Sequence, residues 1–196
     1  ISFGSETAFE SSAAVRDKEI AFDSNVNKVL IAYDLNETDL KYVVGTVSGT
    51  SISFGTAAVF ESAEAGAITL DFDSSNGKVV IAYIDGGDGN KPKAVVGTVS
   101  GTGISFGTAV GIDTGDAANL TMAFDSNSNR IVISYTDGNN SSYGTAIVGT
   151  VSGTTISFGT AVAYNSGTNG QTTITFDSNV NKVAIMHRDQ SDSSDG

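Results

Sequence analysis

The sequence predicts an all-β protein built from four tandem repeats of about 52 residues. The phrase ISFG begins at residues 1, 52, 104 and 156, and the phrase FDS begins at residues 22, 72, 124 and 176. Two separate markers therefore keep one period. Short apolar or alternating segments fill each period between turn residues, without a stretch of helical periodicity, and this pattern is typical of β structure.

Each full period contains four expected strands, as the second period illustrates. The first expected strand (68–72, ITLDF) alternates apolar and polar residues, and the second (78–83, KVVIAY) is apolar throughout and rich in β-branched residues. The third (94–99, AVVGTV) and the fourth (104–110, ISFGTAV) complete the period. Segments of this length and composition favour strands over helices.

Two of the connections have the composition of tight hairpin turns. The first and second strands are joined by DSSNG in one repeat and by DSNVN or DSNSN in the others. Aspartate opens such a turn by bonding its own backbone, and asparagine or glycine tolerates the left-handed conformation at the exit. The third and fourth strands are joined by SGT, in which Gly49, Gly101 and Gly153 supply a positive φ.

Four antiparallel strands in about fifty residues is the layout of a β-propeller blade. In period and strand count, the chain resembles the β-propeller superfamily over essentially its whole length. It lacks the Trp-Asp signature, since it has no Trp. It also lacks the kelch pattern and the Ser-x-Asp-x-Gly-x-Thr-Trp box of sialidase-type blades. The phrases GTVSGTSISFGT and FDSNVNKV are similar to tandem repeats in surface and tail proteins of marine bacteria and phages.

We expect a single domain over residues 1–196, with repeats at approximately 1–51, 52–103, 104–155 and an incomplete 156–196. Because the chain starts at a fourth strand, the resemblance predicts that this N-terminal strand closes the last blade. The closure is imperfect, since the acidic tail RDQSDSSDG stands where a fourth copy of the third strand would be. Either the last blade has three strands, or another chain supplies the third, or the chain is a fragment of a longer array.

Composition excludes several classes of partner. The net charge of −12, from 22 acidic and 10 basic residues, repels phosphate backbones and anionic lipid, so we expect no nucleic-acid partner. The apolar runs are far shorter than the roughly 20 residues that span a bilayer, so we expect no membrane insertion. The absence of cysteine excludes disulfides and zinc–thiolate sites. An acidic chain of this kind is expected outside the cell, on a cell surface or a virion.

The DSN turns have some of the spacing of a calcium loop. Asp125, Asn127 and Asn129 match the first oxygen ligands of such a loop. The sixth position, however, is Lys or Arg rather than Gly in every repeat, and no glutamate closes the loop at position twelve. We therefore interpret these segments as hairpin turns and predict no metal site.

Catalytic chemistry is not indicated by any group of residues. His187 is the single histidine and stands where the other repeats have tyrosine, so we interpret it as an edge position in a divergent final repeat. The carboxylate pairs Asp85 with Asp88 and Asp113 with Asp116 lack the apolar setting that raises a catalytic pKa. We predict no enzyme activity, no catalytic residue and no cofactor.

The alternation of strand direction places the repeated hairpins on one rim of the scaffold and the variable loops on the other. Variable loops on a rigid scaffold are where binding surfaces form. The unrepeated Tyr42, Tyr143 and Tyr164 are expected near this rim. The candidate ligand-binding residues are short polar side chains of the loops between second and third strands, with one tyrosine: Asp34, Asn36, Asp85, Asp88, Asn90, Asp137, Asn139, Asn140 and Tyr143.

The sequence leads to two functional hypotheses. The first is a non-enzymatic, lectin-like adhesion or binding module that recognises neutral glycans or a cell-surface receptor through the variable loops. The alternative is a structural repeat segment of a surface appendage or phage tail fibre, whose partners are other copies of itself or a longer parent chain.

The hairpin interpretation predicts that calcium does not stabilise the fold. Adding a chelator should leave the melting temperature unchanged, because a metal that binds the native state would stabilise it by mass action. The measurement is thermal unfolding followed by circular dichroism, with and without chelator. A drop of several degrees that calcium restores would contradict the hairpin interpretation.

Overall fold

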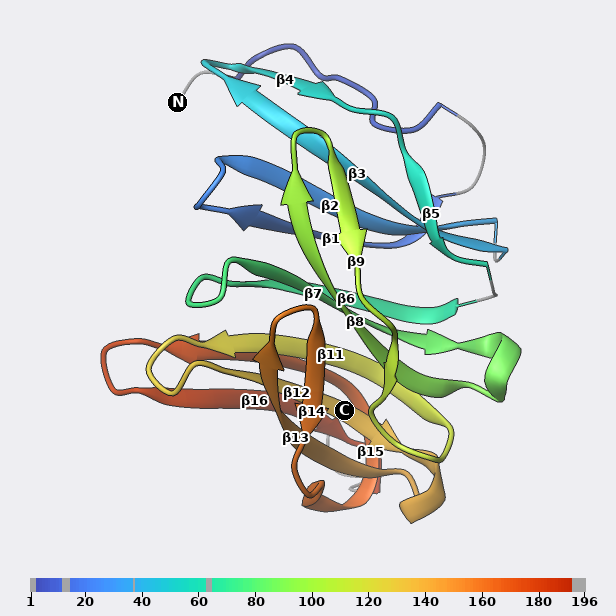
Figure 1. The fold of residues 1–196 in the computed structure, drawn as a ribbon. Helices are drawn as coiled ribbons and strands as arrows, with labels where there is room; N and C mark the ends of the chain where they lie inside the picture. The colour runs from blue at the N-terminus through green and yellow to red at the C-terminus, as the bar shows by residue number, and fades with distance from the viewer. Residues whose placement is uncertain (1–2, 12–14, 37, 63–64, 192–196) are drawn as a thin grey trace.

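The computed structural model describes residues 3–11, 15–36, 38–62 and 65–191 (Figure 1). Within these residues the chain forms sixteen strands and two three-residue 3₁₀ turns. None of its described helical segments is long and apolar enough to cross a membrane. The prediction of an all-β chain is confirmed.

The strands form three antiparallel sheets, each covering about one period of the sequence from a first strand onward, and the third also includes β16. Sheet A contains β1 (Val15–Asp23), β2 (Lys28–Leu35), β3 (Asp39–Ser48), β4 (Ser51–Phe54) and β5 (Ala58–Glu61). Sheet B contains β6 (Ala65–Asp73), β7 (Lys78–Asp85), β8 (Lys91–Ser100), β9 (Gly103–Phe106) and β10 (Val110–Gly111). Sheet C contains β11 (Ala117–Asp125), β12 (Arg130–Asp137), β13 (Tyr143–Ser152), β14 (Thr155–Phe158), β15 (Val162–Asp177) and β16 (Lys182–Asp189).

The fourth strand of each repeat is broken, whereas the sequence predicts a continuous one. In sheet B, β9 pairs with the end of β8 and β10 pairs with its beginning, so Gly107 to Ala109 lie between two short strands. The break occurs where the next repeat comes close, because a Cβ at Gly107 would collide with the carbonyl oxygen of Thr154. Gly55 meets Thr102 in the same way. The glycine of ISFG is therefore required by the SGT turn of the following repeat.

The turns between first and second strands have the hydrogen bonds expected of hairpins. The Asp23 carboxylate accepts the backbone N–H of Asn25 at 2.9 Å and of Val26 at 3.2 Å. Corresponding bonds recur in the other three turns. The exit residues have left-handed φ values of 53, 62, 55 and 53° at Asn27, Gly77, Asn129 and Asn181. Aspartate and the exit residue thus have the roles that the sequence predicts.

The three sheets pack face to face and share their cores in order along the chain. We call the face that packs on the preceding sheet the front face and the opposite face the back face. The second strand of sheet B shows why this strand is apolar throughout: Ile81 and Tyr83 pack on the back of sheet A, while Val80, Ala82 and Ile84 pack on sheet C. Burying a valine or isoleucine side chain in this way contributes about 1.5–3 kcal/mol.

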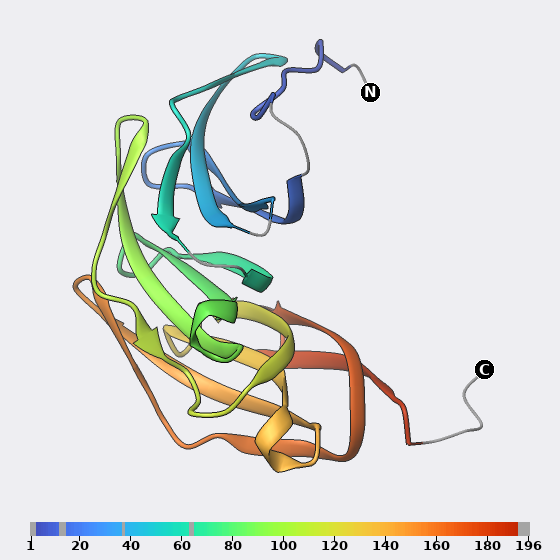
Figure 2. The same cartoon turned by 90° about the vertical axis from the view of Figure 1, so that its right-hand side faces the viewer.

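The sheets follow an open arc, with their first strands on the inner side and β4, β9 and β14 on the outer side (Figure 2). Neighbouring first strands are in contact: β1 contacts β6, β6 contacts β11, and β11 contacts β15. Two side chains of β6 also hold the backbone of β11. Thr69 Oγ1 accepts the N–H of Met122 at 3.2 Å, and Asp71 Oδ2 accepts the N–H of Phe124 at 2.7 Å.

A buried tyrosine links each sheet to the chain segment before it. Tyr83 donates to Glu61 Oε2 at 2.9 Å. Tyr135 makes the same kind of bond to Asp113 Oδ2 at 2.6 Å, and Tyr33 to Glu10 Oε2 at 3.0 Å. All three tyrosine side chains are almost fully buried. Bonds of this kind orient the back of one repeat against the front of the next.

The sequence led us to expect the N-terminal segment beside the last strands, and this expectation is wrong. Residues 3–11 form no strand and lie over the front face of sheet A, where Phe9 packs edge-on against Tyr33 and Phe54. Phe9 and Glu10 occupy the place that Phe60 and Glu61 hold on sheet B. In Figure 2 sheet A, on which residues 3–11 lie, and the β15–β16 hairpin are at opposite ends of the arc.

After the broken fourth strand of sheet C, the chain adds one more hairpin, formed by the second half of β15 and by β16. The first half of β15 pairs with β13, and its second half pairs with β16 over Asn169 to Asp177. His187 of β16 is half-buried beside Tyr164 and lies 3.5 Å from Asn165 Nδ2 through its Nδ1. Histidine and asparagine thus stand where the other repeats have tyrosine and a carboxylate.

Replacing Tyr83 by phenylalanine tests the link between sheets. The change leaves the Glu61 carboxylate without its donor, so we expect the free energy of unfolding to fall by about 1–3 kcal/mol at neutral pH. Burial and the hydrogen bond to Glu61 raise the pKa of Tyr83 well above its ordinary value in the folded protein. In the unfolded chain, tyrosine has its ordinary pKa of about 10. The stabilisation from Tyr83 is therefore complete below about pH 10 and is lost as the pH rises further.

Urea unfolding over a range of pH measures both effects. The difference between the wild type and Tyr83→Phe should narrow above about pH 10. Glu61→Gln is the matched control, because it keeps an oxygen that accepts the tyrosine proton and should cost less. Equal stability of wild type and Tyr83→Phe at neutral pH would contradict the link.

Candidate binding surface

The loops between second and third strands lie together at one end of the sheets. In Figure 1 the β2–β3, β7–β8 and β12–β13 loops are on the right, and the turns between first and second strands are on the left. The antiparallel pairing of each second strand with both neighbours requires this separation. The predicted division of repeated turns and variable loops between the two ends is therefore present in the three sheets.

The β2–β3 loop presents one of its two candidate residues to solvent. Asp34 lies within β2 and is 1% exposed, on the back face of sheet A. Asn36 is exposed and has a left-handed φ of 60°. Thr38 closes the turn by donating its N–H and its hydroxyl to the Leu35 carbonyl, at 3.3 and 3.1 Å.

The β7–β8 loop contains a cluster of opposite charges. Lys93 Nζ lies 2.6 Å from Asp85 Oδ2 and 3.1 Å from Asp88 Oδ2, and Lys91 Nζ lies 2.8 Å from Asp88 Oδ1. The Asp85 side chain is nearly buried, and its Oδ1 has no hydrogen-bond partner. Asn90 is exposed, with a φ of 58°, and its carbonyl accepts the N–H of Ala117. This loop therefore also supports the start of β11.

The β12–β13 loop is ordered by its own aspartate. Asp137 Oδ1 accepts the N–H of Asn139 at 3.0 Å at the start of the 3₁₀ turn η2 (Gly138–Asn140). Asn139 and Asn140 are exposed, and Tyr143 is half-buried where β13 begins. The Asn139 side chain covers Gly115, where a Cβ would collide with it.

Charges near the loops shift several pKa values. Burial raises the pKa of the Asp137 carboxyl, and the nearby charge of Asp113 raises it further. Hydrogen bonds from Lys91 and Lys93 lower the pKa of Asp88, and the bond to Asp85 raises the pKa of Lys93.

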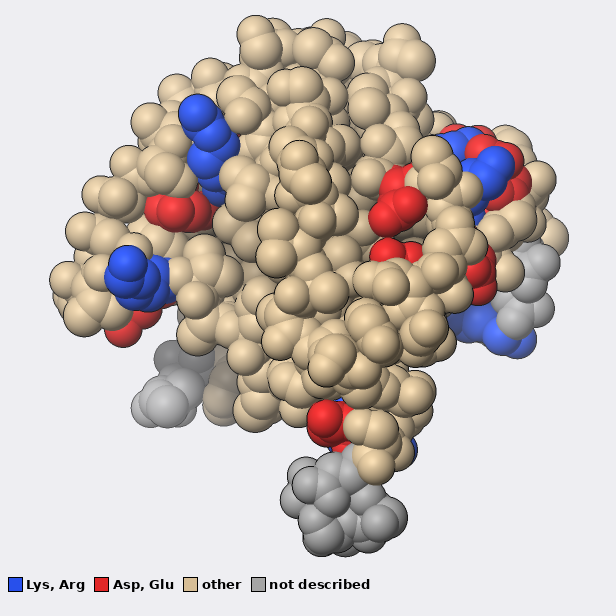
Figure 3. All heavy atoms as spheres, turned by 90° about the horizontal axis from the view of Figure 1, so that it is seen from below, with Lys and Arg blue, Asp and Glu red and all other residues tan. Residues whose placement is uncertain are grey.

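Seen from below, charged side chains gather at the two ends of the strands, and uncharged atoms lie between them (Figure 3).

The structure brings candidate residues together within each loop. Lys93 joins Asp85 to Asp88, and the η2 turn joins Asp137 to Asn139. The two lysines were not singled out from the sequence, although both follow the candidate residue Asn90 closely in the chain. The expectation that Tyr42 lies near the loop surface is wrong. Tyr42 is 9% exposed and lies in the core between sheets A and B, where its hydroxyl bonds to the backbone of Ile104.

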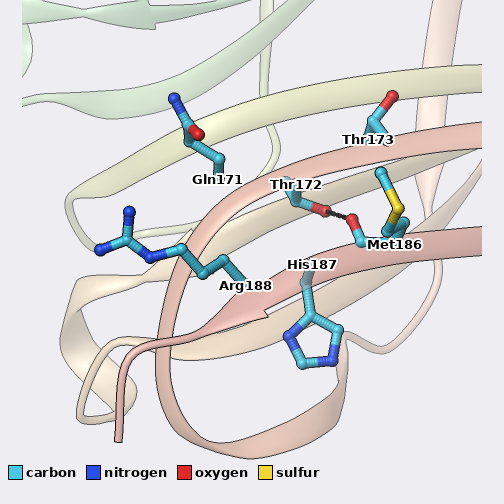
Figure 4. Close-up of a pocket in the computed structure, with 6 residues that line it drawn as sticks. All are labelled: Gln171, Thr172, Thr173, Met186, His187 and Arg188. Carbon is cyan, nitrogen blue, oxygen red and sulfur yellow. Dashed lines mark hydrogen bonds between the residues drawn. The ribbon is translucent and has the colours of Figure 1, made fainter. Parts of the chain in front are cut away.

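Four surface hollows lie away from these candidate residues. Two are on the back face of β15 and β16, with volumes of about 240 and 280 Å³ (Figure 4). A third, of about 290 Å³, lies on the front face of β1, and a fourth follows residues 6–10. None of the four is lined by a candidate loop residue. Across the described parts of the chain, no three His, Cys, Asp or Glu side chains form a group suited to a metal ion.

The sequence matches no protein-family model, and no curated protein is significantly similar to it. A functional assignment therefore depends on the geometry of the fold and its loops.

Removing the charge of Lys93 should destabilise the β7–β8 loop. In Lys93→Met the nearly buried Asp85 carboxylate loses its partner, and we expect the free energy of unfolding to fall by about 1–3 kcal/mol. Lys91→Met is the matched control, because Lys91 pairs with the more exposed Asp88 and should change the urea midpoint little. Equal effects of the two substitutions would show that burial of Asp85 does not decide the strength of this cluster.

Proposed function

We propose that the chain is a non-enzymatic binding module of β-propeller type that works outside the cell, on a cell surface or a virion. Each sheet would be one four-stranded blade, and β15 with β16 would begin the next. The contact between successive first strands supports this arrangement, as does the arc of sheets in Figure 2. The resemblance in period and strand count supports it independently.

The observation that carries the proposal is the difference between the two ends of the scaffold. At one end, the turns repeat the same aspartate and the same left-handed exit in every repeat. At the other end, the three loops differ in sequence and in charge, on strands that are otherwise equivalent. The β7–β8 and β12–β13 loops share one backbone conformation, a 3₁₀ turn followed by two left-handed residues, and present different side chains on it. Such variation on a rigid framework is what a recognition surface requires.

The exposed side chains of these loops favour neutral, hydroxyl-rich ligands. Asn36, Asn90, Asn139 and Asn140 are exposed amides, each offering donors and acceptors with few rotatable bonds. A net charge of −12 disfavours anionic ligands. Neutral glycans, free or on a cell-surface receptor, are the ligand class that this surface fits.

The loop carboxylates support a binding role over catalysis. Asp113 accepts from Tyr135, Asp85 pairs with Lys93, and Asp137 bonds the turn that follows it. These carboxylates are engaged in maintaining the fold. We therefore propose no catalytic residue and no cofactor.

A second candidate function is a structural segment of a surface appendage or tail fibre. The observation that favours it is the exposure of apolar residues at the two ends of the sheet stack, such as Ile20 at 65% and Met186 at 71%. Positions of this kind are buried between neighbouring sheets inside the chain.

A glycan array on the folded protein tests the binding proposal. We expect binding to neutral glycans that is lost when Asp88 and Asn90 are both changed to alanine, because these two residues project from the β7–β8 loop. Asn179→Ala, in the turn at the opposite end, is the matched control and should bind like the wild type. If no neutral glycan binds, or if the loop variant binds as well as the control, the structural candidate is favoured instead.

A further inference from the structure

The front face of sheet A has bare apolar residues at positions that are covered in the other sheets. Ile20 and Phe22 of β1 are 65% and 53% exposed. The corresponding residues of β6, Leu70 and Phe72, are 7% and 6% exposed, because the back of sheet A covers them. Residues 3–11 cover the neighbouring front-face residues Tyr33 and Phe54 but leave Ile20 and Phe22 open. The uncovered part of the front face is therefore its first strand.

The back face of β15 and β16 is uncovered in the complementary way. Thr173, Ala184 and Met186 are exposed there, and Met186 is 71% exposed. At the corresponding positions of sheet B, Thr69, Val80 and Ala82 are 6%, 0% and 0% exposed, because sheet C covers them. Figure 4 shows Thr173 and Met186 beside the hollow on this face, while His187 points away to the other side.

The hydrogen-bonding groups of the two faces also correspond. Inside the chain, Thr69 accepts the N–H of Met122 from the first strand of the next sheet. Thr173 is the equivalent of Thr69, and Ile20 is the equivalent of Met122. If the back of β15–β16 packs on the front of β1, Thr173 is in position to accept the N–H of Ile20.

We infer that a second copy of this chain binds head to tail, with the front of its β1 on the back of β15 and β16. The contact continues the interface that already joins sheets A, B and C, with the same positions buried. Residues 3–11 of the second copy stay in place, since they occupy fourth-strand positions and the incoming hairpin provides first and second strands. Because the two surfaces differ, the association is heterologous and extends beyond a dimer unless it closes into a ring.

Sedimentation velocity over a concentration series tests the inference. The wild type should gain mass with concentration beyond that of a dimer. Ile20→Glu blocks the front face and Met186→Glu blocks the back face, so each variant alone should stay monomeric where the wild type is assembled. Mixed in equal amounts, the two variants should form one-to-one dimers and nothing larger, because each keeps one intact face.

Val180→Glu is the matched control, since Val180 is 62% exposed in the turn between β15 and β16, off both faces. It should assemble like the wild type. Circular dichroism spectra should be the same for all variants, and so should the melting temperatures at a concentration where the wild type is monomeric, because the substituted side chains are exposed. A wild type that stays monomeric at every concentration would overturn the inference, as would a mixture that remains monomeric. Assembly of Met186→Glu like the wild type would also overturn it, because it would indicate front-to-front pairing. Asp88 and Asn90 lie outside both faces, so the glycan-array result for their double variant is independent of the sedimentation result.

Discussion

The packing of each front face on the preceding back face is the contact on which the rest of this structure depends. A single four-stranded sheet of this size has two apolar faces and cannot bury either one alone. The second strands of sheets A and B alternate their buried residues between two neighbouring cores, as Ile81 and Ala82 show. The stability of each repeat is therefore tied to its neighbours, as in other repeat architectures.

This packing between sheets explains which residues recur from repeat to repeat. The glycine of ISFG is fixed because the SGT turn of the next repeat lies against it, as at Gly107 and Thr154. The tyrosine of the second strand is fixed because it bonds the carboxylate that ends the preceding fourth strand. In the last repeat both members of that pair change together, to His187 and Asn165, and they remain neighbours.

Much of the fold could be predicted from local signals in the sequence. Strand positions follow from apolar patterning, and the left-handed exits at Asn27 and Gly77 follow from turn composition. The location of residues 3–11 could not be predicted, because the same segment fits against a front face or beside a last strand by pattern alone. Tyr42 was misplaced for a similar reason: its burial depends on sheet B, which is distant in sequence. The ion pairs of Lys93 depend on how the β7–β8 loop folds, which spacing does not specify.

The same constraint separates the two surfaces on which function is proposed. Sheet-to-sheet contact uses the faces of the strands, and the loops at their ends contribute little to it, apart from a few anchors such as the Asn90 carbonyl. Loop side chains can therefore change without loss of the core. The end faces have the opposite property, since Ile20 and Met186 occupy positions that every internal sheet buries. In a stack of sheets joined by equivalent interfaces, the first and last sheets each keep one apolar face that is exposed unless another segment or chain covers it. Among the described residues, Ile20 and Phe22 of β1 and Met186 of β16 are exposed on these faces, while the variable loops project away from both.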